Sequence, residues 1–182
     1  TWDITRQTPF STNSNSSQQF GALFNNQGYA FAFSGPQDGT PTELAVSFGS
    51  GSSGGARVAI YDSTADGEPG TIIAHGEMTY SASAIVFDTS LIGPGGGSAS
   101  SMTVGDLYWC VMTRSDGTAD TTFQCSVSGS RGKTTPSTTI NTAGMCLETS
   151  SLSATISFPD TAPAITSWNA QNTLMPLVGV RF

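Results

Sequence analysis

The fold class is decided by one stretch of the chain, which reads ARVAIYD at residues 56–62, STADGEPG at 63–70 and TIIA at 71–74. In the first part, Val58 and Ile60 occupy alternate positions, so their side chains point to one side of an extended chain. The middle part is rich in Asp, Gly and Pro, which favour turns. The stretch therefore predicts two short β-strands joined by a turn, with one face of the pair buried.

Short alternating runs of the same kind recur along most of the chain, and segments rich in Gly, Pro and Ser separate them. The predicted strands cover residues 29–33, 43–49, 56–62, 71–74, 84–88, 107–113, 121–127, 152–158 and 174–181. No segment combines helical periodicity with capping residues. Because these strands are too numerous for one flat sheet, we expect an all-β, antiparallel two-sheet sandwich of jelly-roll or related Greek-key topology. The Gly/Ser-rich loop at 50–55 is expected to join two neighbouring strands of one sheet.

The first 28 residues differ from the rest, because they are rich in Ser, Asn and Gln and carry large apolar side chains without a clear period. A free tail would not need such side chains, so we expect an extended N-terminal arm or edge strand that packs on this domain or on a neighbouring subunit. A partly disordered lead-in is the equal alternative. The predicted organisation is an arm at residues 1–28 and a β-sandwich domain at 29–182. The residues assigned to the assembly arm are Trp2, Phe10, Phe20 and Phe24.

The charge of the chain limits its partners. The formal net charge is -7, and the six basic residues include a single lysine, Lys133. No basic patch is available to neutralise phosphates, so we expect no nucleic-acid partner. No stretch approaches the roughly 20 apolar residues of a spanning helix, and the polar N-terminus lacks the layout of a signal peptide. We therefore expect a soluble chain without membrane association.

The three cysteines are Cys110, Cys125 and Cys146, and none of them lies in a CxxC or Cys/His metal-binding pattern. The favoured interpretation is that all three are buried, reduced thiols that behave as small apolar groups. Thiols stay reduced in the cytoplasm, so this interpretation favours a protein that is made and assembled there. Cys110 and Cys125 flank the turn at 116–117 and could be cross-strand neighbours. A secreted domain with a disulfide between them is the alternative.

Candidate catalytic residues are few. His75 is the only histidine, it lies in a predicted turn, and no GxSxG nucleophile motif is present, so we expect an exposed loop histidine and no catalytic triad. Asp62, Asp66 and Glu68 could act as glycosidase acids or calcium ligands, although their spacing does not match an EF-hand. Capping of turn amides explains these carboxylates better. We therefore predict no enzyme activity, no metal and no cofactor.

Two tryptophans lie near predicted strands. Trp109 is in the middle of the strand at 107–113 and is expected in the core. Trp168 lies in a polar stretch before the last predicted strand, which makes it the better candidate for exposure. Exposed tryptophans stack on sugars or anchor subunit contacts, so Trp168 is a candidate glycan or subunit contact, with the structural role favoured.

The stretch at 56–74 resembles a recurring β-sandwich pattern in which a V-x-I-Y-D strand precedes a G-x-P-G-T-x-x-A turn and strand. The segment Gly105-Asp106-Leu107-Tyr108-Trp109 is similar to the G-x-x-Y-W strand of the same modules. Such sandwiches occur in virion proteins of tailed phages and in bacterial surface and carbohydrate-binding modules. The resemblance covers about the middle half of the chain, carries no ligand residues, and rests mostly on turn and core positions.

The resemblance and the predicted arm together lead us to expect a non-enzymatic structural virion protein of a tailed phage. It would be a capsid decoration (cement) protein or a fibre component that assembles on other virion proteins as a homotrimer. Its expected location is the virion surface after assembly in the host cytoplasm, or alternatively a secreted or cell-surface location. The alternative function is a carbohydrate- or receptor-binding module of a fibre tip or bacterial surface protein, with a host-surface glycan as partner.

Overall fold

The computed structural model describes residues 28–47, 54–80, 85–114, 125–127, 146–149, 158–162, 168–171, 174–176 and 178–182. Its elements are β1 (Gly28–Ser34), β2 (Glu43–Ser47), β3 (Gly54–Ser63), β4 (Pro69–Tyr80), β5 (Ile85–Asp88), the short 3-10 helix η1 (Pro94–Gly96), β6 (Leu107–Arg114), β7 (Cys125–Val127), β8 (Cys146–Thr149), β9 (Trp168–Gln171), β10 (Leu174–Pro176) and β11 (Val178–Arg181). The predicted all-β class is confirmed. Across these described ranges, no helix has the length and apolar character needed to cross a membrane.

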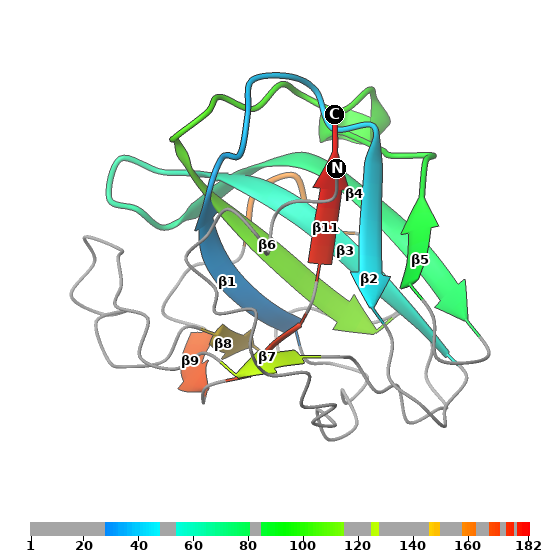
Figure 1. The fold of residues 1–182 in the computed structure, drawn as a ribbon. Coiled ribbons are helices and arrows are strands. Elements are labelled where there is room, and N and C mark those ends of the chain that lie inside the picture. Colours follow the sequence, from blue (N-terminus) through cyan, green and yellow to red (C-terminus); the bar gives the residue numbers. More distant parts are fainter. Residues whose placement is uncertain are drawn as a thin grey trace.

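The strands form two main antiparallel sheets that pack as a sandwich (Figure 1). The large sheet has the order β4-β3-β6-β1-β8-β9, the small sheet has the order β11-β2-β5, and β10 pairs with β7 separately. Three strand pairs are nested in sequence, namely β3 with β4, β2 with β5, and β1 with β6. The pairs β3–β4 and β1–β6 lie side by side in the large sheet, and the pair β2–β5 belongs to the small sheet. The predicted antiparallel two-sheet sandwich is thereby confirmed, and nested pairs that alternate between two sheets are a feature of the jelly-roll and related Greek-key topologies that were expected.

The main core lies between the two sheets. Alternate residues of each strand point into it, because successive side chains of a strand face opposite sides of a sheet. Phe31, Cys110 and Ile60 form one row across β1, β6 and β3, and all three are fully buried. Leu44 of β2 and Val180 of β11 approach from the small sheet and belong to the same cluster.

Part of the outer face of the large sheet, on β1, β3, β4 and β6, is buried as well. A second apolar cluster covers it, and the segment 158–162 contributes Phe158 and Ala162 to that cluster. The central strands are therefore buried on both faces, whereas the sequence pattern predicted burial of one face. One row of this outer cluster crosses four adjacent strands and consists of Ala32, Trp109, Tyr61 and Ile72.

The structure corrects the predicted end of the strand at 71–74. β4 continues to Tyr80, because Gly76 is a strand position and not part of a turn. Glycine is needed there for close packing, since a Cβ atom at Gly76 would lie 2.8 Å from Asp88 Oδ2. A glycine inside a strand often marks such a close approach.

The connections between strands also differ from the prediction. β2 and β3 belong to different sheets, so the expectation that the loop at 50–55 joins neighbours in one sheet is wrong. The predicted strand at 174–181 is divided into β10 and β11, which pair with strands of different sheets. β8 and β9 were not predicted. Of the predicted strand at 152–158, only Phe158 is described, and it lies outside any strand.

Candidate functional site

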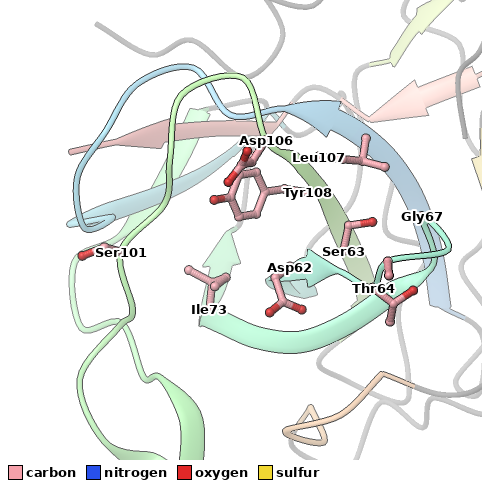
Figure 2. Close-up of a pocket in the computed structure, with 10 residues that line it drawn as sticks. Asp62, Ser63, Thr64, Gly67, Ile73, Ser101, Asp106, Leu107 and Tyr108 are labelled. Atoms are coloured by element: carbon pink, nitrogen blue, oxygen red, sulfur yellow. The ribbon is translucent and has the colours of Figure 1, made fainter.

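A polar hollow of about 530 Å³ opens beside the end of the β3–β4 hairpin (Figure 2). The end of β3 with its turn forms one side, Ile73 of β4 adds apolar surface, and the loop that leads into β6 forms another side. The volume lies within the range of small-molecule sites, which is roughly 300 to 1,000 Å³. Its polar lining residues are Asp62, Ser63, Thr64, Ser101, Asp106 and Tyr108.

Irregular pairing between β3 and β4 shapes this hollow. Ile60 pairs with Ala74 and Tyr61 pairs with Ile72, so Ile73 is an extra residue in β4. Such a β-bulge bends the strand and redirects side chains, and bulges are frequent next to functional sites. The bulge places the Ile73 side chain at the hollow, as Figure 2 shows.

Asp62 lies within a second irregularity, between the pairs Tyr61–Ile72 and Ser63–Pro69. Its Oδ1 atom accepts a hydrogen bond from the Thr71 backbone N–H. A Cβ atom at Gly70 would collide with the same oxygen, so a glycine is required beside it. The predicted amide-capping role of Asp62 is thereby confirmed.

The turn after β3 is anchored from the core. Gly67 N–H donates to the Thr64 carbonyl at 2.9 Å, and the Thr64 hydroxyl accepts from Glu68 N–H at 3.1 Å. The buried Trp109 indole donates from Nε1 to the Gly67 carbonyl at 3.1 Å. Trp109 is 1% exposed, which confirms its predicted place in the core.

The loop before β6 is held at three points. Ser100 N–H donates to the Ile73 carbonyl at 2.9 Å, and Met102 exchanges two backbone hydrogen bonds with Gly39 at 2.7 and 3.1 Å. Val104 N–H donates to Asp38 Oδ1 at 2.8 Å. These contacts fix one wall of the hollow, so little ordering is needed when a ligand binds.

Tyr108 and Asp106 enter the hollow from this wall (Figure 2). The Tyr108 side chain is only 4% exposed, and its ring centroid lies 6.0 Å from that of Phe33. Its hydroxyl oxygen accepts a hydrogen bond from Thr103 N–H at 2.7 Å. Asp106 and Tyr108 are two residues apart, so an extended chain turns both side chains to the same face.

The chemistry of the hollow is that of an acidic, hydroxyl-rich surface. Its described lining holds two carboxylates, Asp62 and Asp106, and includes no histidine, cysteine, lysine or arginine. Nowhere in the described ranges do three His, Cys, Asp or Glu side chains come together in a way that could hold a metal ion. The lining can therefore accept hydrogen bonds strongly and donate a few, which suits ligands with many hydroxyl groups.

Sequence reasoning identified Asp62 but missed Ser101, Asp106 and Tyr108. The G-x-x-Y-W segment carried a signal for two of them, because alternation places Asp106 and Tyr108 on the face opposite Trp109. Ser101 lies in a loop far along the chain from Asp62, and only the tertiary fold brings it to the hollow. The other two acids of the predicted cluster, Asp66 and Glu68, do not line the hollow.

The expectation that His75 is an exposed loop histidine is wrong. It lies inside β4, where its backbone forms an isolated bridge with Ile92, with N–O distances of 2.8 and 3.0 Å. Its half-buried ring makes an edge contact with Phe158 at a centroid distance of 6.0 Å. Burial lowers the pKa of His75, the Arg57 charge lowers it further, and Asp160 and Asp88 partly offset both effects.

Of the other predicted site residues, the structure describes only the backbone of Trp168. Trp168, which the sequence placed in a polar stretch before the last predicted strand, is the first residue of β9 and pairs with Thr149 of β8, so its backbone belongs to the large sheet. Its role as a glycan or subunit contact stays a prediction. The proposed arm residues Trp2, Phe10, Phe20 and Phe24 lie outside the described residues.

The register also bears on the cysteines. Cys110 of β6 is buried between Phe31 of β1 and Ile60 of β3. Cys125 of β7 pairs with Pro176 of β10, in a different ladder. The suggestion that Cys110 and Cys125 are cross-strand neighbours is therefore wrong.

Comparison of the sequence with protein-family models and with curated proteins adds no relative to this description. The similarity of residues 56–74 and 105–109 to sandwich modules of phage and bacterial surface proteins therefore remains a resemblance of pattern. The fold and the hollow are the basis for an interpretation of function. No protein-family model matches the chain, and no curated protein matches its sequence.

Proposed function

We propose that the protein is a non-enzymatic structural component of a tailed-phage particle, a jelly roll that assembles on other capsid or tail proteins as a decoration or fibre component. The observation that carries the proposal is the nested strand pairing, with β3–β4 and β1–β6 in one sheet and β2–β5 in the other. Double-sheet jelly rolls of this kind build viral capsid domains. The aromatic-studded N-terminal segment offers apolar anchors for docking on a neighbouring subunit.

The use of aspartates in the fold supports a structural role. Four aspartate side chains each accept a hydrogen bond from a backbone N–H group in a loop or strand, and so fix the backbone where sheet pairing does not. A fixed loop presents a constant surface, which favours binding to a regular array of neighbours with little rearrangement. These side chains are Asp38, Asp62, Asp88 and Asp160.

The edge of the large sheet at β4 fits the same role. Thr71 forms a bridge with Thr161, and His75 forms a bridge with Ile92, so this edge is covered at two points. Covered edges reduce unspecific pairing between sheets of different molecules. Assembly would then use side-chain surfaces and the N-terminal segment, which can be specific for one partner.

The proposal is tested on particles and on the purified chain. We expect antibodies against the chain to detect it in density-purified phage particles from its source, and the purified protein to have three times the chain mass of 18.7 kDa. Replacing Trp2, Phe10, Phe20 and Phe24 together by Ser should abolish incorporation into particles, because the proposal assigns these side chains to contacts with a neighbouring subunit. Under the proposal, the sandwich of this variant should still unfold at the wild-type midpoint.

A matched control is Val104→Ser, which removes an apolar side chain that is 54% exposed in a loop of the sandwich. This variant should be incorporated like the wild-type chain. Full incorporation of the four-residue variant, or particles that lack the protein, would contradict the proposal.

A further inference from the structure

Three polar groups in the hollow have hydrogen-bonding capacity that the described part of the chain does not use. The Tyr108 hydroxyl accepts a hydrogen bond from Thr103 N–H, but among the described residues its own proton has no acceptor. This matters because Tyr108 is 4% exposed and is one of the residues that line the hollow. A buried hydroxyl normally donates its proton, so the position is prepared for an acceptor that comes from outside.

The two carboxylates of the hollow have spare acceptor capacity. Asp62 uses Oδ1 to accept from Thr71 N–H, and its Oδ2 has no hydrogen-bond donor within the described part of the chain. The exposed Asp106 carboxylate has no donor for either oxygen within those same ranges. An ionised carboxylate accepts several hydrogen bonds, and bonds to it are stronger than those between neutral groups.

We propose that this hollow binds a neutral saccharide of one or two sugar units. Neighbouring sugar hydroxyls would donate to Asp62 Oδ2 and to Asp106, and a sugar oxygen would accept the Tyr108 proton. Ile73 and Leu107 line the same hollow and offer apolar surface to the C–H groups of a sugar ring. This binding activity goes beyond the proposed structural role and does not depend on it.

The composition of the lining selects this ligand class. An anion is disfavoured, because the two charged lining residues, Asp62 and Asp106, are both acidic. A metal ion is disfavoured, because the described residues include no group of three or more His, Cys, Asp or Glu that could ligate it. A neutral polyol uses both the acceptors and the donor, and the hollow of about 530 Å³ is large enough for it.

The hollow is also preformed. Its turn is tied to the core by Trp109 Nε1, which donates to the Gly67 carbonyl at 3.1 Å. Its opposite wall is tied to β4 by the hydrogen bond from Ser100 N–H to the Ile73 carbonyl at 2.9 Å. A site whose walls are fixed before binding loses less entropy on binding, which matters for weak ligands such as single sugars.

The test uses the full-length purified chain and a panel of D-glucose, D-galactose, D-mannose, N-acetyl-D-glucosamine and their disaccharides, measured by saturation-transfer NMR and titration. We expect at least one sugar to bind. Asp106→Asn should weaken binding about tenfold by replacing charge-assisted hydrogen bonds, and Tyr108→Phe should weaken it severalfold by removing the donor. Asp66→Asn is the matched control, because it makes the same charge change in an exposed turn residue outside the lining.

The unfolding midpoint of each variant shows whether it is folded. Asp106→Asn should unfold at the wild-type midpoint. Tyr108→Phe should unfold slightly earlier, because it loses the hydrogen bond from Thr103 N–H. The proposal is overturned if no sugar of the panel binds, or if Asp106→Asn binds the sugar like the wild-type chain. A titration with CaCl2 tests whether the hollow is a calcium site. The proposal is also overturned if calcium binds, Asp106→Asn abolishes calcium binding, and no sugar binds. Sugar binding that is lost in Trp168→Ala but unchanged in Asp106→Asn would place the site elsewhere and would equally overturn it.

Discussion

The central strands of the large sheet bury side chains on both faces, but the two faces are built differently. The inner face packs apolar side chains such as Phe31 and Ile60 against the small sheet. On the outer face, Trp109 and Tyr61 bury their rings, and each also donates a hydrogen bond to a loop carbonyl, at 3.1 Å to Gly67 and 2.8 Å to Pro159. The inner face thus stabilises the fold mainly by burial, with a hydrogen bond from Thr103 N–H to the Tyr108 hydroxyl as an exception. On the outer face, the two largest rings both hold loop backbone, including the turn that borders the hollow.

The largest expected effect is on the inner face. Phe31 is fully buried, so Phe31→Ala should lower the free energy of unfolding by about 3–5 kcal/mol through lost burial and a new cavity. Urea unfolding followed by tryptophan fluorescence measures this change. Val104→Ala, at a position 54% exposed, should change it by less than about 0.5 kcal/mol. A loss of less than about 1 kcal/mol for Phe31→Ala would mean that the inner face is not the main source of stability.

The outer face should show an intermediate effect that depends on its hydrogen bonds. Trp109→Phe keeps an aromatic ring but leaves the buried Gly67 carbonyl without its donor, so we expect a loss of about 1–3 kcal/mol in the free energy of unfolding. Tyr61→Phe removes the bond to Pro159, an exposed residue whose carbonyl can turn to water, so its loss should stay below about 1 kcal/mol. Urea unfolding of both variants measures the difference. Equal losses would contradict a positioning role for the Trp109 hydrogen bond.

The same comparison explains how much of the fold the sequence could predict. Alternation at Val58 and Ile60 identified strands and the inner face, because a period of two is a local property of the chain. Ala59 lies between these two residues, so its side chain points to the outer face. Because alanine is common in both buried and exposed positions, the sequence pattern did not predict its burial, although Ala59 is fully buried. The cover over that face includes residues 158–162, which approach β4 from a distant part of the sequence.

The candidate site was predictable only in part, for a related reason. Asp62 stands in a turn-rich stretch, and its capping role follows from local chemistry. The hollow itself arises from the extra residue Ile73 in the β3–β4 pairing and from Ser101 in a separate loop. Neither the register shift nor the approach of that loop has a local signal in the sequence, because both are set by tertiary packing.

The smallest expected effect concerns pH and the edge of the outer face. The pKa of His75 is lowered by burial and by Arg57, so the folded state favours the neutral ring. Stability from this residue is complete above the unfolded pKa of about 6.5 and is lost as the pH falls below it, since the unfolded chain then binds the proton more readily. His75→Gln should flatten the fall in urea midpoint between about pH 7.5 and pH 5.5, a window that lies above the usual range of most carboxylates. Identical slopes for both proteins would show that Asp160 and Asp88 cancel the effects of burial and Arg57, and that the contact with Phe158 is insensitive to the charge of the ring.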